Sequence, residues 1–157
     1  MTGTIHSICI STQKGTKKKE VSSAEIITNW GIEHDAHAGS WHRQLSLLSV
    51  GSIEKMKEKG YRAQPGDFAE NVTIEGIDFS QIRRGDKMII NDVIVLEITQ
   101  IGKECHTGCE IQQITGDCIM PREGVFARVV QGGKIEKGHK VIRLSRAEDL
   151  PPLNPKS

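Results

Sequence analysis

The sequence predicts a mainly β protein: a compact β-barrel with one or a few short helices. Its 157 residues, 36% of them hydrophobic and 26% charged, suit one globular domain with a core of ordinary size. Most of the chain divides into short runs rich in β-branched residues, and each run is bounded by Gly, Asp or Asn. Because these runs are numerous and closely spaced, we expect the strands to form a closed barrel.

The expected strands follow one another along the whole chain. The first is followed by a lysine-rich loop around Gly15. Turn residues at Gly85-Asp86 and Asn91-Asp92 enclose a short strand, and Gly132-Gly133 marks a turn before Lys134. The pattern predicts strands at residues 4–10, 45–50, 71–74, 87–90, 93–99, 125–130 and 140–144.

One helix interrupts the strands, over residues 51–59. Its apolar residues recur at helical spacing, Ser49 or Ser52 can cap its start, and Gly60 is placed to end it. The segment 22–25 has the pattern of a capping box, but the apolar residues beside it fit an extended edge strand equally well. Both alternatives stay open for that segment.

We expect one domain over residues 1–146 and a disordered, proline-rich tail over residues 147–157. The 21 basic and 20 acidic residues nearly cancel, which excludes the broad positive surface of a protein that binds nucleic acid or an anionic membrane. The basic run from Lys17 to Lys19 is typical of a solvated loop.

Three features that the sequence lacks bear on the cellular compartment of the protein. No apolar stretch approaches the roughly 20 residues that a membrane-spanning helix needs, and the N-terminus does not have the pattern of a secretory signal. The 4 cysteines are too few and too unevenly spaced for the disulfide framework of a small secreted domain. We therefore expect a cytoplasmic protein with reduced thiols.

The most informative segment follows the strand predicted at residues 93–99. It contains Lys103, Cys105 and His106, so a thiol would lie at an exposed edge beside a cation and an imidazole. Both neighbours favour the thiolate over the thiol, which makes Cys105 a candidate nucleophile. The alternative is that Cys105 is a small packed residue and His106 a loop residue.

A second polar segment lies at residues 31–43. Its three histidines, two acids and one arginine are denser than an ordinary surface loop requires. Donor atoms of His34, Asp35 and His37 could bind a metal, although their spacing matches no familiar zinc motif. Arg43, together with backbone amides near Gly39, could instead bind a phosphate.

Two further segments bear on ligand binding. Residues 65–71 form a turn before a strand, and the carboxylates and amide of this turn could meet at a ligand or simply bond nearby backbone. Arg122 and Arg128 flank another turn and strand and suit an oxyanion or a phosphate. Either arginine could equally be a surface charge.

Taken in order, these segments resemble the MOSC domain, the module named after the C-terminal part of molybdenum cofactor sulfurases. The resemblance extends from about Ile5 to Leu144 and implies a mostly β, barrel-type fold, in agreement with the strand pattern. The segments that carry it are GIEHDAHAG, RQLSLLS, PGDFAENVTIEGIDF, IRRGDKMIINDVIVLEITQIGKECH and MPREGVFARVVQGGKIEKGHKVIRL.

The resemblance assigns chemistry first to Cys105, which falls where MOSC domains carry their characteristic cysteine. It implies that this residue either carries sulfur as a persulfide or ligates molybdenum, and both roles require a thiolate. The remaining residues that the resemblance places near a pterin-phosphate pocket are Asp35, His37, Gly66, Asp67, Asn71, Arg122 and Arg128. His34 stands where the family normally has glycine, so a positive φ there would add strain.

The function implied is sulfur carriage or handling of the molybdenum cofactor, with a sulfurtransferase-like role and the cofactor as ligand or substrate. The partners expected are a sulfur donor such as a cysteine desulfurase, and molybdenum cofactor biosynthesis proteins or molybdoenzymes. No lysine has a recognisable pyridoxal phosphate setting, so we expect pyridoxal phosphate to belong to larger proteins of the family and not to this chain.

Two alternatives remain open. The domain could be a noncatalytic module that binds molybdopterin or molybdate and passes it to another protein. Cys105, Cys109, His106 and Cys118 could also form a structural zinc site, although their spacing is unlike that of familiar zinc fingers.

Overall fold

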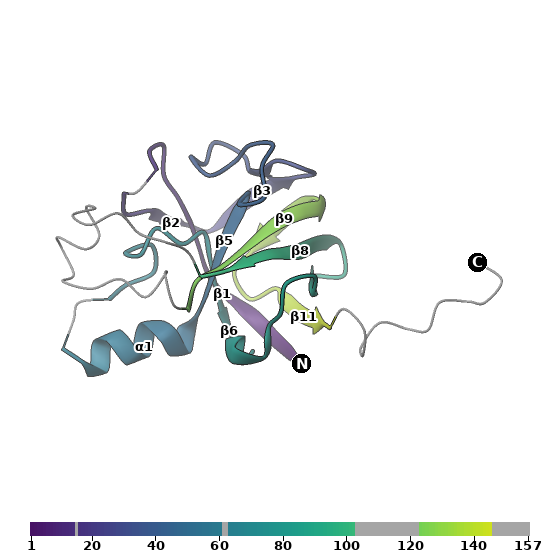
Figure 1. Cartoon of the computed structure of the whole chain (residues 1–157). Helices are drawn as coiled ribbons and strands as arrows, with labels where there is room; N and C mark the ends of the chain where they lie inside the picture. Colours follow the sequence, from purple (N-terminus) through teal and green to yellow (C-terminus); the bar gives the residue numbers. More distant parts are fainter. Residues whose placement is uncertain (15, 61–62, 103–122, 146–157) are drawn as a thin grey trace.

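The computed structural model describes residues 1–14, 16–60, 63–102 and 123–145, and it is mainly β (Figure 1). It contains one α-helix, α1 (Val50–Glu58), and one short 3-10 helix, η1 (Phe79–Gln81). The strands are β1 (Thr2–Ile10), β2 (Lys19–Val21), β3 (Ser23–Ile27), β4 (Gly31–Ile32), β5 (Leu45–Ser49), β6 (Val72–Glu75), β7 (Lys87–Ile90), β8 (Ile94–Ile101), β9 (Val125–Gln131), β10 (Gly133–Glu136) and β11 (Lys140–Leu144).

Seven strands close into a barrel, in the order β11-β7-β8-β9-β5-β6-β1, and β1 pairs back onto β11. Neighbouring strands run antiparallel except β5 and β6, which are parallel. A parallel pair cannot be joined by a tight hairpin, and the connection between β5 and β6 contains α1. β2 extends the sheet beside β1, and β10, β3 and β4 form a separate small sheet.

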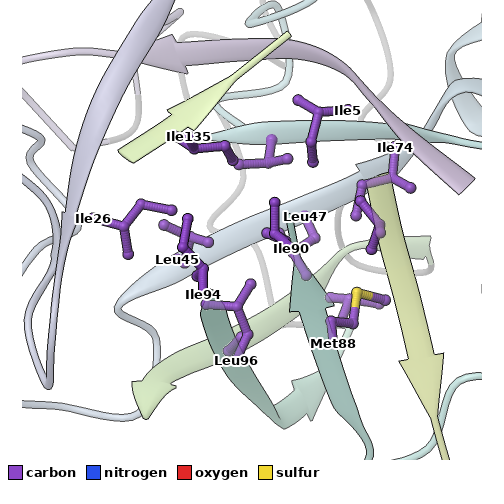
Figure 2. Close-up of a cluster of buried hydrophobic side chains, with 14 of the residues drawn as sticks. Ile5, Ile26, Leu45, Leu47, Ile74, Met88, Ile90, Ile94, Leu96 and Ile135 are labelled. Atoms are coloured by element: carbon purple, nitrogen blue, oxygen red, sulfur yellow. The ribbon is translucent and has the colours of Figure 1, made fainter. Parts of the chain in front are cut away.

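The main core consists mostly of branched aliphatic side chains from the barrel strands, which on β5, β7, β8 and β9 occupy every second position, and it includes Ile26, Ile32 and Ile135 of the small sheet. On β9, for example, Val125, Ala127 and Val129 belong to this core. Figure 2 shows these side chains between the strands. The labelled ones are Ile5, Ile26, Leu45, Leu47, Ile74, Met88, Ile90, Ile94, Leu96 and Ile135.

A second apolar cluster lies on the outer side of the barrel wall. Leu48 and Phe126 are neighbours of core residues in sequence but point the other way, and they pack with Ile53 and Met56 of α1 and with Phe68. Ser49 caps α1 by accepting a hydrogen bond from the Ser52 amide at 3.1 Å. The helix therefore forms where the sequence predicts it, one residue earlier.

The predicted strands all form: those at 87–90 and 140–144 have the expected bounds, and the ends of the others are displaced by at most two residues. Residues 23–25 are extended, because they belong to β3, which pairs with both β10 and β4, so the capping-box alternative is wrong. The sequence gives no separate indication of β2, β4 and β10, which are short and depend on their partners. Residues 147–157 lie outside the described part of the chain, and a single domain over residues 1–146 stays a prediction.

Within the described residues, no helix has both the length and the apolar character that a membrane span requires.

Candidate functional site

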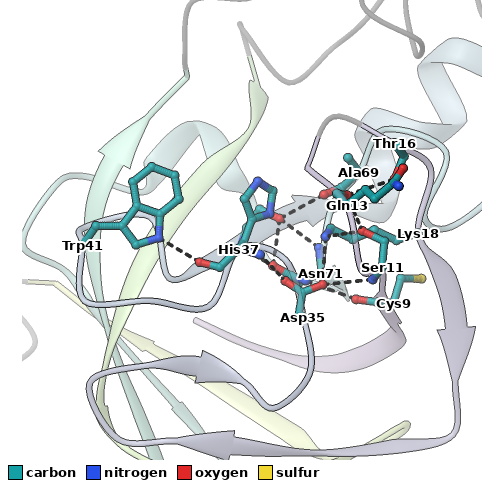
Figure 3. A network of polar contacts seen from close by, with 11 residues as sticks. Cys9, Ser11, Gln13, Thr16, Lys18, Asp35, His37, Trp41, Ala69 and Asn71 are labelled. Atoms are coloured by element: carbon teal, nitrogen blue, oxygen red, sulfur yellow. Dashed lines mark hydrogen bonds and ion pairs between the residues drawn. The ribbon is translucent and has the colours of Figure 1, made fainter.

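Three loops meet beside the barrel: residues 11–14 with 16–18, residues 33–44 and residues 64–71. Backbone hydrogen bonds join them, from the Ala36 amide to the Ser11 carbonyl at 2.8 Å and from the Lys18 amide to the Gly66 carbonyl at 2.8 Å. Figure 3 shows the polar side chains that converge there. We call this group of loops the polar cluster.

A buried ion pair lies at the centre of the polar cluster. Lys18 Nζ is 2.8 Å from Asp35 Oδ1, and the two side chains are 1% and 0% exposed. The carboxylate also accepts hydrogen bonds from the Ser11 amide at 3.1 Å and the His37 amide at 2.9 Å. Burial alone would raise the pKa of Asp35, but the hydrogen bond and charge of Lys18 hold it below its ordinary value, so Asp35 is ionised.

Glu70 is a second buried carboxylate, with 0% exposure. It accepts hydrogen bonds from the Gly66 amide at 2.8 Å, the Phe68 amide at 3.2 Å and Thr73 Oγ1 at 3.3 Å. Among the described residues it forms no ion pair with a cation. Burial therefore prevails and raises the pKa of Glu70 to about 7, although its hydrogen bonds act in the opposite direction.

Asn71 connects the polar cluster to the barrel. Its Oδ1 accepts hydrogen bonds from the Ser46 amide at 3.0 Å and Ser46 Oγ at 3.1 Å, and its Nδ2 donates to the Cys9 carbonyl at 3.2 Å. Asn71 thus joins the loop to β5 and β1. Burial raises the pKa of the Cys9 thiol to about 12, and the nearby carboxylate of Glu70 adds to the shift, so Cys9 is a packed and unreactive residue.

Two cations lie against one indole ring at the edge of the polar cluster. Lys14 Nζ is 4.5 Å from the Trp41 ring centroid, and Arg43 Cζ is 5.6 Å from it. Arg43 also lies over Phe126, and its Nε donates to Gln100 Oε1 of β8 at 3.2 Å. In the described ranges, neither Lys14 nor Arg43 forms an ion pair with a carboxylate. Their charges are therefore available to an anion.

The structure brings together most of the described residues that the sequence singles out. Asp35, His37, Gly66, Asp67 and Asn71 all belong to the polar cluster. Their contacts are largely with backbone, as the Asx-type alternative for residues 65–71 predicts: the Gln64 amide donates to Asp67 Oδ2 at 3.0 Å.

Other predicted residues lie elsewhere. Arg128 pairs with Glu97 across β8 and β9, so its guanidinium is already engaged by a carboxylate. The proposed roles of Lys103, Cys105, His106 and Arg122 concern residues outside the described ranges, as do those of Cys109 and Cys118.

The metal alternative for residues 34–37 is not supported. The His34 side chain is 81% exposed and pairs with Glu33, whereas Asp35 is enclosed with Lys18. No three His, Cys, Asp or Glu side chains among the described residues are grouped as a metal site requires. The backbone at His34 has a φ of +70°, so the strain expected from histidine in place of glycine is present.

Sequence reasoning missed Lys18, Lys14 and Trp41. The prediction of a solvated loop at residues 17–19 is wrong for Lys18, which is only 5% exposed. A lysine in a basic run carries no local sign of burial; the only indication is that a buried Asp35 requires a cation. Trp41 stands two residues before Arg43, but its role depends on the fold of the loop.

The comparisons with known proteins agree with this fold. The profile of the MOSC domain matches residues 34–142. The structure resembles the YuaD protein from Bacillus subtilis, with a TM-score of 0.75, 18% identity, and coverage of 90% of this chain and 94% of that one.

Two YiiM proteins are also similar. For YiiM from Escherichia coli the TM-score is 0.67 at 16% identity, covering 96% of this chain and 73% of that one. For YiiM from Geobacillus stearothermophilus the TM-score is 0.69 at 19% identity, covering 92% of this chain and 76% of that one. No curated protein sequence matches the chain significantly. These likenesses show the fold, and the profile match shows that the chain belongs to the MOSC domain family, which is associated with the molybdenum cofactor.

Proposed function

We propose that this domain handles sulfur for the molybdenum cofactor, with Cys105 as the sulfur carrier and an anion-binding site beside it. One observation carries the proposal: Arg43 is hydrogen-bonded to Gln100 of β8, and the chain that leaves β8 continues to Lys103 and Cys105. An available guanidinium is thus fixed to the strand that leads to the candidate nucleophile.

The electrostatic setting supports this role. Lys14 and Arg43 add positive charge near the end of β8, and Lys103 adds another close to Cys105 in sequence. Positive charge favours a thiolate and attracts an anionic substrate. The molybdenum cofactor, as a pterin phosphate, is such a substrate, and we treat it as cargo of the domain.

The step assigned to Cys105 is persulfide transfer. The thiolate attacks the terminal sulfur of a donor persulfide, such as the one formed on a cysteine desulfurase. A new sulfur–sulfur bond forms at Cys105, the donor sulfur–sulfur bond breaks, and the donor leaves as a thiolate. No net oxidation or reduction occurs. His106 and Lys103 would favour the attacking thiolate.

Mass spectrometry of the native protein after incubation with a persulfide donor tests the proposal. We expect the wild type and Cys109→Ala to gain the mass of one sulfur atom and Cys105→Ala to gain none. Equal sulfur on Cys105→Ala and the wild type would show that another residue carries it. Resistance of the added mass to a thiol reductant would show that it is not a persulfide.

A second candidate is a noncatalytic module that binds molybdopterin or molybdate and delivers it to molybdoenzymes or biosynthesis proteins. The observation in its favour is that Lys14 and Arg43 are held by Trp41, independently of any thiol. In that case the wild type and Cys105→Ala bind the anion equally and neither accepts sulfur. The structural zinc site has its own signature. Purified wild type would then contain stoichiometric zinc that Cys105→Ala lacks, and the metal ligands would come from Cys105, His106, Cys109 and Cys118.

A further inference from the structure

We propose that the buried Lys18–Asp35 ion pair is a positioning device, which fixes Trp41 and so holds Lys14 and Arg43 where they attract an oxyanion such as a phosphate. The inference deepens the proposed function, on which it rests, by naming the groups that attract the anion and the contacts that place them. It gives roles to Lys18, Trp41 and Lys14.

The first link is between Lys18 and the loop that contains Asp35. Lys18 Nζ is held by two acceptors, Asp35 Oδ1 at 2.8 Å and Ser11 Oγ at 3.1 Å. The Ser11 amide donates to the same Asp35 oxygen, at 3.1 Å. The loop after β1 and the loop after β4 are thus locked together at one carboxylate, in a region closed to solvent.

The second link leads from Asp35 to the indole. Asp35 Oδ2 accepts from the His37 amide at 2.9 Å, and the His37 carbonyl accepts from Trp41 Nε1 at 2.8 Å. In Figure 3 the indole N–H points at that carbonyl, on the far side of the loop from Lys18. The peptide groups on either side of His37 therefore transmit the position of Asp35 to the Trp41 ring.

The third link joins the indole to the cations. An aromatic face attracts a cation that lies within about 6 Å of the ring centroid. Lys14 Nζ at 4.5 Å and Arg43 Cζ at 5.6 Å satisfy this condition on the same ring. Long basic side chains otherwise sample many rotamers, so a fixed ring confines both charges to one region.

A purely structural role explains the ion pair less well. Replacing a buried ion pair by apolar side chains of similar volume is often neutral or stabilising, so stability alone gives weak grounds for such a pair. The pair here does more than fill space, because both Asp35 oxygens orient backbone amides of the two loops that carry Lys14 and Trp41.

Quenching of Trp41 fluorescence by iodide tests the inference. The chain has 2 tryptophans, and Trp30→Phe leaves Trp41 as the sole emitter. Iodide is an anion and acrylamide is neutral, so the ratio of their quenching constants reports positive charge at the ring. We expect Lys18→Met in this background to lower that ratio about twofold and to shift the emission maximum, because the indole loses its fixed position.

Lys19→Met is the matched control, because it removes an equal charge from the same basic run at an exposed position. It should leave both readouts unchanged. A double-mutant cycle adds a second check: after Lys14→Met, the effect of Lys18→Met on the ratio should shrink, because one of the positioned charges is gone. Should Lys18→Met fail to fold, Lys18→Met/Asp35→Asn, which leaves no unpaired charge, carries the same test.

A folded Lys18→Met protein with an unchanged ratio and an unchanged emission maximum overturns the inference and leaves the pair a structural one. Failure of the sulfur-carrier proposal looks different. If Cys105 accepts no sulfur but Lys18→Met lowers the ratio, the positioning of Lys14 and Arg43 stands and only the chemistry at Cys105 is wrong.

Discussion

The loop around Asp35 and the turn around Glu70 each fold about a buried carboxylate, but the two carboxylates differ in charge. Asp35 accepts hydrogen bonds from a lysine and from backbone amides, whereas Glu70 accepts them from two backbone amides and a hydroxyl. The pKa of Asp35 lies below its ordinary value and that of Glu70 is raised to about 7. Amide donors can thus orient a buried carboxylate, but of these two carboxylates only the one that also has a cation beside it stays ionised well below neutral pH.

The comparison also separates two ways of holding a loop. The Asp35 loop is fixed by a charge from another part of the chain, and it carries the groups that we assign to anion binding. The Glu70 turn is held mainly by donors from its own residues 66–73 and meets Lys18 through its backbone. Five predictions concern these two regions, and they run from the largest expected effect to the smallest.

Removing the cation should have the largest effect. Lys18→Met leaves Asp35 buried without its ionic partner, and we expect the free energy of unfolding to fall by about 3–5 kcal/mol. Urea denaturation at neutral pH measures this change. Lys19→Met, at an exposed site, should change it by less than about 0.5 kcal/mol. A loss of similar size in both variants would contradict the distinction between them.

The two carboxylates should give opposite dependences on pH. The folded-state pKa of Glu70 is raised from 4.5 to about 7, so the folded protein keeps a proton that the unfolded chain loses. Stability should therefore fall as pH rises from about 4.5 to about 7, by about 3 kcal/mol. Glu70→Gln should remove this dependence in urea denaturation across that range.

For Asp35 the sign is reversed. Its folded-state pKa is lowered from 3.8, so its contribution is present above that value and is lost as pH falls below it. The double variant Lys18→Met/Asp35→Asn, which leaves no unpaired buried charge, should remove that acid-side loss and leave the dependence between pH 4.5 and 7 intact. A wild type whose stability is flat between these values would show that Glu70 is ionised throughout.

Gly66 connects the two regions and should tolerate no side chain. Its φ is +90°, and an added Cβ would lie 2.1 Å from the Lys18 carbonyl oxygen. We expect Gly66→Ala to cost about 3 kcal/mol, since strain and overlap add. Gly60 is the control, because its φ is +87° but no atom of the described residues lies within 4 Å of an added Cβ. Gly60→Ala should therefore cost only about 1 kcal/mol. Thermal or urea unfolding distinguishes the two.

The smallest effect concerns His34, whose φ of +70° suits glycine and whose side chain is exposed. We expect His34→Gly to stabilise the protein by about 0.5–1 kcal/mol in urea denaturation, because the strain is relieved. His34→Ala keeps the strain and should be neutral. If the alanine variant gains as much as the glycine variant, the effect comes from losing the imidazole and not from the backbone.

Much of the barrel could be predicted from the sequence. The 87–90 and 140–144 strands form as expected, because β-branched runs between turn residues already satisfy local preferences. The short strands β2, β4 and β10 could not be identified, since their extended conformation depends on partners distant in the chain. The family resemblance followed from the sequence as well, and the profile match confirms it.

In the candidate site, less could be predicted from the sequence than in the barrel. The sequence by itself determined which residue types gather near Asp35 and Asn71 and that the chain is a MOSC domain. Only the tertiary structure decided that the Lys18 side chain is buried against Asp35 while its neighbours in the basic run are not, and that Lys14 and Arg43 both contact Trp41. The physical reason is that burial and ion pairing depend on groups brought together from separate loops, whereas strand and turn preferences act between neighbours in the chain.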